Sequence, residues 1–323
     1  MKRRRRCKIK MNQSKQLTEG AVFAAIFIVI LTMTFFIPLS KIVTIFLLPV
    51  PFVIYTARHG WKPAVIVFIV AMLIGAILLS VVSIPFTLFM GLGGIAIGSA
   101  INEQRKAYET WARGTLGFTL GLALIYVFTQ FFLNINWMEE IRRALERSFE
   151  TLQVLFEQVG QTVDEETLEI VRDQMESFVY LIPTGIVIIG VAFAFITQWI
   201  SYRILNRLHK EKNSFPPFKD FRLPTSIIWI YFAGIILTWI YTEPTDSLYL
   251  VATNVYTLAG LLIVIQGLSF AFFFTNYKKW SKAIPITLTV LFVLFPFLLL
   301  YPFRILGIID LGFQLRDRLV SKK

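Results

Sequence analysis

Long apolar runs recur along the chain, and short polar segments separate them. A helix that crosses a bilayer needs about 20 apolar residues. The pattern predicts eight spans and one further apolar stretch: about 18–39, 42–57, 62–82, 84–101, 112–133, 180–204, 225–242 and 248–274, and then 284–312. We therefore expect an all-α fold, a polytopic bundle of transmembrane helices.

The last apolar stretch is interrupted by Pro296 and Pro302. As one crossing it would be a ninth span and would place the basic C-terminus outside. A helix to about Leu300, a turn at Tyr301-Pro302 and a shorter return would keep those charges inside. We prefer this broken hairpin after eight clear spans, and nine spans is the alternative.

The lysines and arginines of the short loops predict the orientation, because such residues gather on the cytoplasmic side. With the N-terminus inside, the outer connections carry little positive charge beyond Lys41. The inner connections carry Arg58, Lys62, Arg105, Lys106, Arg113, the basic loop 203–222, Lys278, Lys279 and Lys282. We expect a multi-pass membrane protein with its N-terminus in the cytoplasm.

One outer segment differs from the spans. Residues 134–178 hold 11 of the 20 acidic residues. Apolar residues recur there at helical spacing: Met138, Ile141, Leu145, Phe149, Leu152, Phe156 and Val159. Gly160 is a plausible helix stop, and Thr162 with Glu165 has the spacing of a capping box that starts a second helix. We expect an extracytoplasmic amphipathic helical hairpin that packs on itself or on the bundle, covers an outward-facing site, or docks a second protein.

The composition supports a lipid environment. Of 323 residues, 56% are hydrophobic and 16% are charged, and the mean hydropathy is +0.67. A soluble domain has about 25% charged residues, so a soluble enzyme, a disordered chain and a secreted disulfide scaffold are excluded. The net charge of +12 follows the loops, so it indicates topology rather than nucleic-acid binding.

The N-terminus has two candidate starts. Residues 1–10 include seven basic residues, and Met11 opens a more ordinary start. Met11 is our hypothesis for the physiological start. The apolar run that follows is longer than that of a signal peptide, so we expect an uncleaved first span.

Few residues in the spans could carry chemistry. Cys7 is the single cysteine, and His59 and His209 fall in predicted loops without ligand spacing. We therefore expect no enzyme activity, no catalytic residue, no metal site and no cofactor. Arg304 and Asp310 are ionisable residues at membrane depth; they could pair if the segment bends, and otherwise we expect both to reach the headgroup region, with Arg304 snorkelling.

Uncharged polar residues and small residues predict helix packing. Polar side chains in the sixth and eighth spans are expected to bond between helices, with lining of a substrate site as the minority reading: Gln198, Ser201, Asn254, Thr257, Gln266 and Ser269. Gly94 and Gly98 form a GxxxG pair, and Ala21 and Ala25 an AxxxA pair. Such spacings let helices approach closely.

Three stretches carry a resemblance to a family. They are Leu17 to Ala25 (LTEGAVFAA), Gln266 to Ser269 (QGLS) and Leu306 to Phe313 (LGIIDLGF), the last continuing to Arg316. With the six-span front half, they resemble the YybS family of bacterial membrane proteins. The front half of that family is in turn similar to the substrate-binding S subunits of energy-coupling-factor (ECF) vitamin transporters.

The resemblance implies a six-helix bundle with a solute site near its outer face. It also implies that an AxxxA on the first helix, here Ala21 and Ala25, docks on a coupling subunit driven by ATPase subunits. The chain departs from that pattern by its insertion of about 45 residues, its additional spans and the lack of a vitamin-specific signature. Because the chain has no Walker motif, any ATP use would come from a partner.

The expected organisation is a basic N-terminus (1–17), a six-span bundle (18–204) with the insertion 134–178, a basic loop (205–224) and the C-terminal spans (225–323). Two functions are open. One is solute binding or transport with a partner, and its candidate outer-mouth residues are Asn134, Asn136, Trp137 and Tyr180. The alternative is a membrane scaffold that recruits proteins through the outer hairpin or the 203–222 loop. Partners besides the lipid bilayer would be coupling subunits, ATPase subunits or other membrane proteins, and no nucleic acid.

Overall fold

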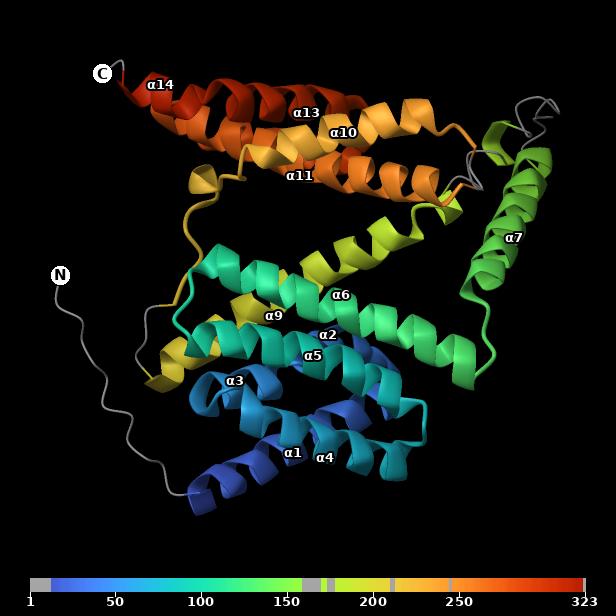
Figure 1. The fold of residues 1–323 in the computed structure, drawn as a ribbon, viewed down its shortest axis with the longest axis vertical. Coiled ribbons are helices and arrows are strands. Elements are labelled where there is room, and N and C mark those ends of the chain that lie inside the picture. Colours follow the sequence, from blue (N-terminus) through green and yellow to red (C-terminus); the bar gives the residue numbers. More distant parts are fainter. Residues whose placement is uncertain (1–12, 159–169, 173–177, 210–212, 244–245, 322–323) are drawn as a thin grey trace. The chain divides into compact units, whose positions relative to one another are not determined.

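The computed structural model describes residues 13–158, 170–172, 178–209, 213–243 and 246–321, and all regular elements in them are helices (Figure 1). The α-helices are α1 (Gln13–Phe36), α2 (Lys41–Leu47), α3 (Val50–His59), α4 (Trp61–Leu79), α5 (Ser83–Asn102), α6 (Ala107–Phe132), α7 (Trp137–Gln158), α9 (Ile182–His209), α10 (Ser226–Ile240), α11 (Ser247–Tyr277), α12 (Ala283–Leu294), α13 (Pro296–Phe313) and α14 (Leu315–Ser321). Two 3₁₀ helices, η1 (Pro38–Ser40) and η2 (Phe218–Asp220), join them. The predicted all-α class is confirmed.

Eight segments of the described chain are long and apolar enough to cross a membrane. They are Ser14–Phe36, Pro38–His59, Trp61–Leu79, Ser83–Asn102, Ala107–Phe132, Ile182–Leu208, Ser247–Tyr277 and Pro296–Phe313. Two apolar helices, Ser226–Ile240 and Ala283–Leu294, are shorter. The structure is therefore a polytopic helical bundle, as the apolar runs predict.

The chain divides into two compact units. The first unit contains the residues up to Ile141 together with Ile186–Phe215. The second contains Arg142–Gly185 and Pro216–Lys323. The first unit overlaps most of the expected six-span segment, while the larger part of the insertion groups with the second unit.

In the first unit, α5 packs against α3, α4 and α6, and glycines bring the backbones together. A Cβ on Gly94 would lie 2.7 Å from the carbonyl oxygen of Pro49 in the turn that opens α3. A Cβ on Gly98 would lie 2.6 Å from the carbonyl oxygen of Val53. The small residues of the GxxxG pair therefore face α3 of the same chain.

Aromatic rings fill the interior of the first unit. Phe27 and Phe52 pack with their centroids 4.7 Å apart, and Phe89 packs on Phe118 at 5.1 Å. These four rings, with Phe68, are at most 8% exposed. Close-packed aromatic surface of this kind stabilises the bundle interior through burial and dispersion.

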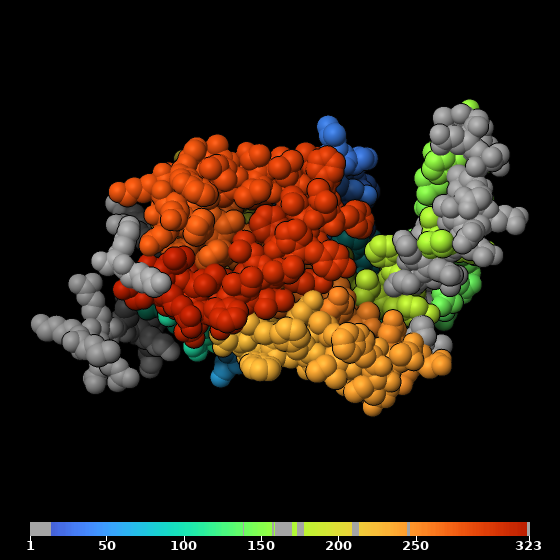
Figure 2. All heavy atoms as spheres, turned by 90° about the horizontal axis from the view of Figure 1, so that it is seen from above, coloured from blue at the N-terminus to red at the C-terminus, as the bar shows by residue number. Residues whose placement is uncertain are grey.

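In the second unit, α11 is the central helix and packs on α10, α12 and α13. A Cβ on Gly267 would lie 2.0 Å from the carbonyl oxygen of Phe303, so α11 and α13 touch through their backbones. The colour gradient in Figure 1 runs in the same direction along α11 and α13, so the two helices run broadly parallel and cross at Gly267 and Gly307. In Figure 2 the orange-to-red atoms of α11 to α14 form one continuous body.

The C-terminal hairpin is present, but its break is not at Tyr301-Pro302 as the sequence analysis expects. The helix is interrupted at Phe295, with φ −130° and ψ 62°, and Pro296 opens α13. Pro302 lies inside α13. A proline fits the first turn of a helix without loss of a hydrogen bond, and neighbouring helices tolerate one in a transmembrane interior.

The direction of α13 bears on the two interpretations of the last apolar stretch, a broken hairpin or a single crossing. Since α13 runs parallel to α11 and α12 lies between them in the chain, α13 ends on the same side of the unit as α11 (Figure 1). The basic residues after α13 therefore lie on the side of Lys278 and Lys279. The stretch 284–312 is therefore not one continuous helix, which favours the broken hairpin over a single ninth crossing.

The first helix of the expected outer hairpin is α7. Its residues Leu152, Leu155 and Phe156 are 44%, 51% and 42% exposed. Arg172 lies beside α7, since its Nη2 is 3.5 Å from Oε1 of Glu146. Most of the second predicted helix, with Gly160, Thr162 and Glu165, lies outside the described residues.

Candidate functional site

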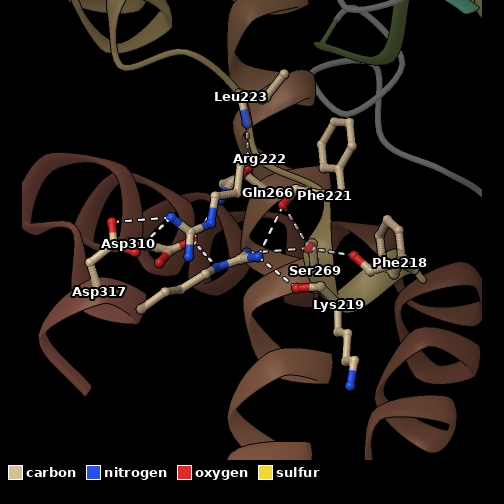
Figure 3. Close-up of polar contacts among 10 residues, drawn as sticks. Phe218, Lys219, Phe221, Arg222, Leu223, Gln266, Ser269, Asp310 and Asp317 are labelled. Carbon is tan, nitrogen blue, oxygen red and sulfur yellow. Dashed lines mark hydrogen bonds and ion pairs between the residues drawn. The ribbon is translucent and has the colours of Figure 1, made fainter. Parts of the chain in front are cut away.

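A polar cluster lies in the second unit where α11, α13, α14 and the loop before α10 meet (Figure 3). We define the polar cluster as Gln266, Ser269, Asp310, Arg316 and the loop 218–223. Gln266 and Ser269 stand on α11, Asp310 stands near the end of α13, and Arg316 stands at the start of α14. Two stretches that carry the family resemblance therefore meet at one place.

Arg316 is the centre of the polar cluster. Its Nε donates to Oδ2 of Asp310 at 2.9 Å. Its Nη1 donates to the carbonyl oxygens of Lys219 at 2.7 Å and Phe221 at 3.0 Å. Its Nη2 donates to the hydroxyl of Ser269 at 3.2 Å. One guanidinium thus joins α11, α13, α14 and the loop.

Gln266 and Ser269 complete the connection to the loop. Gln266 donates through Nε2 to Oδ2 of Asp310 at 2.6 Å and accepts from the backbone N–H of Leu223 at 3.0 Å. The hydroxyl of Ser269 lies 2.7 Å from the carbonyl oxygen of Phe218 and 3.0 Å from that of Phe221. The polar residues of the eighth span therefore make hydrogen bonds between elements.

The charges of the polar cluster are deeply buried. The side chains of Arg316 and Asp310 are only 3% and 2% exposed. Burial lowers the pKa of the Arg316 guanidinium, and the carboxylate of Asp310 opposes that shift. Because arginine remains protonated in proteins, the pair is an ion pair with no net charge.

A cavity of about 150 Å³ adjoins the polar cluster. Gln266, Asp310 and Arg316 line it, together with an exposed ion pair between Arg222 and Asp317, whose Nη1 and Oδ1 are 2.8 Å apart. Four of the Arg316 donors are already bound by groups of the chain, so the arrangement suits the anchoring of the loop. Among the described residues, no group of three His, Cys, Asp or Glu could hold a metal ion.

Arg304 and Asp310 do not pair with each other, because α13 is continuous between them and Asp310 is bound by Arg316 and Gln266. Arg304 is 8% exposed and points into the second unit, where its Nη1 lies 3.3 Å from the hydroxyl of Tyr256 and 3.4 Å from that of Tyr231. Both side chains are buried within the second unit, and the expectation that they reach the headgroup region stays a prediction.

The AxxxA residues lie on the outside of the first unit. Ala21 lines an apolar groove of about 240 Å³ between α1 and α4, which we call the Ala21 groove. The small residues Gly20 and Ala24 also line it, together with larger side chains that include Tyr55 and Val67. Ala25 is also exposed on α1 but does not line the groove.

A charged contact stands beside the Ala21 groove. Glu19 on α1 accepts from Nε2 of His59 at 2.9 Å, and Arg58 lies 3.5 Å from the same oxygen. The ring of His59 packs on Tyr55 with centroids 4.6 Å apart. His59 is the last residue of α3 rather than a loop residue, and its ring contacts both the carboxylate of Glu19 and the ring of Tyr55. His209 likewise ends α9.

The four outer-mouth residues have local roles. The side chain of Asn136 accepts from the backbone N–H of Glu139 at 3.3 Å, in the first turn of α7. Trp137 donates its indole N–H to the hydroxyl of Thr129. Asn134 has a left-handed backbone, with φ 52°. Tyr180 belongs to the second unit, where its carbonyl oxygen accepts from Asn254 at 2.8 Å.

The sequence analysis missed several members of the polar cluster. Arg316 and Arg222 entered it only as loop charges, and Leu223 and the carbonyls of 218–221 gave no signal. One signal was present: Arg316 closes the stretch that resembles the family. Its role could not be read from spacing, because its partners other than Asp310 are 47 to 97 positions away.

Comparisons with known proteins agree with this architecture. The chain is 29% identical over 309 residues to the protein of Bacillus subtilis (strain 168) named "Uncharacterized protein YybS", covering 95% of this chain and 99% of that protein. No solved structure matches the chain. The family described as predicted membrane protein (DUF2232) matches residues 25–311, which include most of the polar cluster, and the chain therefore belongs to this family of membrane proteins.

Proposed function

We propose that this membrane protein is a non-enzymatic subunit that binds a transmembrane helix of a partner protein in the Ala21 groove. The observation that carries the proposal is the groove itself, which is apolar, open and lined by the small residues Gly20, Ala21 and Ala24. Helices in membranes associate through van der Waals contact, and small residues let two backbones approach. A partner helix with a similarly small face would fit there.

The resemblance to S subunits suggests what class of protein this partner is. It would be a transmembrane coupling subunit, and ATPase subunits bound to it would supply energy. The lysines and arginines of the loops favour the cytoplasmic half of the membrane for this end of α1, which is where such a partner would reach cytosolic ATPases. The ion pair of Glu19 with His59 and Arg58 would border the contact.

We favour partner binding over solute binding because aromatic side chains fill the interior of the first unit. Phe27, Phe52, Phe89 and Phe118 occupy the space between its helices. The outer-mouth residues Asn136 and Trp137 already have partners within the chain. A solute role for these residues stays a prediction.

A second surface supports the alternative of a protein scaffold. The exposed apolar side chains of α7, Leu152, Leu155 and Phe156, form an amphipathic face outside the spans. A double substitution, L152S with L155S, should abolish recruitment through this face while partner binding at the Ala21 groove persists. Loss of both would contradict separate surfaces.

The groove is tested by disulfide or photochemical cross-linking in native membranes. In a Cys7→Ser background, single cysteines at Leu17 and Ala21 should cross-link to one and the same membrane protein. A cysteine at Val29, which is 59% exposed on α1, is the matched control and should not.

The complementary test fills the groove. Ala21→Leu should reduce recovery of the cross-linked partner about tenfold, a loss of roughly 1.4 kcal/mol of binding free energy. Val29→Leu adds bulk to the same helix elsewhere and should leave recovery unchanged. Ala25→Leu distinguishes a contact confined to the groove from one that uses both alanines. If Ala21→Leu recovered as much of the cross-linked partner as the wild type does, the proposal would be refuted.

A further inference from the structure

Arg304 is a buried cation near the middle of α13. It is 8% exposed and lies level with Gly260 of α11. The nearest polar-cluster residue on α11 is Gln266, six residues further along, which is about 9 Å at the rise of an α-helix. Arg304 therefore lies deep within the span, away from the polar cluster.

No carboxylate of the described residues forms an ion pair with Arg304. The acid nearest along its own helix, Asp310, is bound by Arg316 and Gln266. A buried charge without a counter-charge is strongly unfavourable, and within a membrane it usually marks a functional site. The chain alone does not neutralise this residue.

Three tyrosines surround the guanidinium and stabilise it only in part. Its Cζ lies 5.7 Å from the ring centroid of Tyr231, 5.8 Å from that of Tyr256 and 5.5 Å from that of Tyr301. Its two hydrogen bonds, to the hydroxyls of Tyr231 and Tyr256, are long. Rings and hydroxyls attract a cation but carry no negative charge.

The hydrogen bonds of Arg304 leave one edge of the guanidinium free. Both bonds use Nη1. Nε is buried without a partner, and Nη2 makes no hydrogen bond to any described residue. Nε–H and Nη2–H together form the fork that a carboxylate or a phosphate accepts with two oxygens.

Gly260 holds this geometry. A Cβ at this position would lie 3.2 Å from Nε, Cζ and Nη2 of Arg304 alike. The guanidinium therefore rests on the backbone of α11, with the tyrosine hydroxyls at its Nη1. A side chain at Gly260 would push the fork out of place.

An apolar stripe leads to the site along α13. Phe297, Tyr301 and Ile305 follow one another at intervals of four residues and are 90%, 65% and 57% exposed. Tyr301 contacts both this stripe and the guanidinium. An acyl chain lying on the stripe would carry its head group toward Arg304.

We infer that the Nε–Nη2 edge of Arg304 binds the oxyanion of a membrane lipid of net negative charge, a phosphate monoester or a carboxylate, rather than the choline-paired phosphodiester of phosphatidylcholine, while the lipid's acyl chain lies along Phe297, Tyr301 and Ile305. The bound oxyanion supplies the counter-charge that the second unit lacks. The site is independent of the Ala21 groove, so either proposal can fail without the other.

The test compares thermal unfolding midpoints of purified full-length protein in nanodiscs. The discs contain phosphatidylcholine alone, or with phosphatidic acid, or with oleate, and one series in phosphatidylcholine alone receives inorganic phosphate. The variants are Arg304→Met and Arg304→Lys. Arg203→Gln removes an exposed arginine that lies over Trp199, and it is the control for a general loss of positive charge.

In phosphatidylcholine alone, Arg304→Met should match or exceed the wild-type midpoint, since it removes an uncompensated charge. One or both anionic lipids should raise the wild-type midpoint above that of Arg304→Met, and Arg304→Lys should need about ten times more of the anionic lipid because ammonium lacks the fork. The responding lipid identifies the source of the oxyanion. Arg203→Gln should follow the wild type.

Four results would overturn the inference. An Arg304→Met protein that is less stable than wild type by the same margin in every disc, or that does not fold in phosphatidylcholine, would make Arg304 a structural residue. If the anionic lipid raised the unfolding midpoints of wild type and Arg304→Lys equally, the Nε–Nη2 fork would not be needed for binding. A rise with inorganic phosphate alone would assign the counter-charge to free phosphate, and no rise of the wild-type midpoint with either anionic lipid would leave Arg304 without a lipid ligand.

Discussion

Replacing Asp310 by alanine probes the polar cluster at its most buried point. The substitution removes the oxygen that accepts from both Arg316 and Gln266, at 2.9 Å and 2.6 Å. It leaves the guanidinium in place, since Arg316 keeps its bonds to Lys219, Phe221 and Ser269. The variant therefore contains a buried charge without a counter-charge.

The structure sets the size of the effect. Two donors lose their acceptor, and each unsatisfied buried donor costs about 1–3 kcal/mol. Removal of one partner of a buried ion pair costs about 3–5 kcal/mol in total. Since the cavity of about 150 Å³ beside Asp310 lets water approach, we expect a loss near the lower end, roughly 3 kcal/mol of unfolding free energy.

Asp317→Ala is the matched control. Asp317 also pairs with an arginine, Arg222, at 2.8 Å, but these side chains are 59% and 49% exposed. Surface ion pairs contribute about 0–1 kcal/mol. The assay is denaturant-induced unfolding of the purified protein in a mild detergent, followed by tryptophan fluorescence.

A double-mutant cycle completes the experiment. Arg316→Met in the Asp310→Ala background removes the stranded charge, so the double variant should lose less stability than the sum of the single losses. Two results would refute the reasoning: equal losses in Asp310→Ala and Asp317→Ala, or strictly additive effects in the cycle. Either would mean that the buried pair does not hold the loop on the helices.

Two further predictions concern helix packing and pH. Gly267→Ala should destabilise the protein by about 1–3 kcal/mol by overpacking, because its Cβ would meet the carbonyl oxygen of Phe303 at 2.0 Å, whereas Gly185→Ala, whose Cβ meets nothing within 4 Å, should be neutral or slightly stabilising in the same unfolding assay. Hydrogen bonds from Arg105 and Arg113 lower the pKa of the Glu103 carboxyl, so its contribution is present at neutral pH and is lost as the pH falls through the lowered value. The difference in unfolding midpoint between wild type and Glu103→Gln should vanish in acid. A difference that persists in acid would contradict the lowered pKa of Glu103 as its cause.

The sequence located seven of the eight expected spans, because hydrocarbon imposes a length and a composition on every crossing helix. The expected span 225–242 is the shorter helix Ser226–Ile240, and the eighth long apolar helix of the described chain is Pro296–Phe313 in the last stretch. The sequence also located the stretches 266–269 and 306–316, which meet in the polar cluster. It could not show that they meet, since a helical period tells which residues share a face and not which helix that face contacts. The bond between Arg316 and Lys219 joins residues 97 positions apart.

The break in the C-terminal hairpin shows the limit of local rules. Pro296 and Pro302 have similar sequence surroundings, and the sequence analysis chose the second for the turn. The first opens α13, while the second lies inside it, where α11 packs against the backbone at Phe303. Tertiary contact decided between two residues with the same intrinsic preference.

Arg316 and Arg304 show what a buried arginine requires. Arg316 has four acceptors from its own chain, one of them a carboxylate, so its place is complete without a ligand. Arg304 has two long bonds to neutral hydroxyls and a free fork. Both guanidiniums face the same penalty for leaving water, and only one has it offset within the chain. The polar cluster is therefore the place to test stability, and Arg304 is the place to search for a ligand.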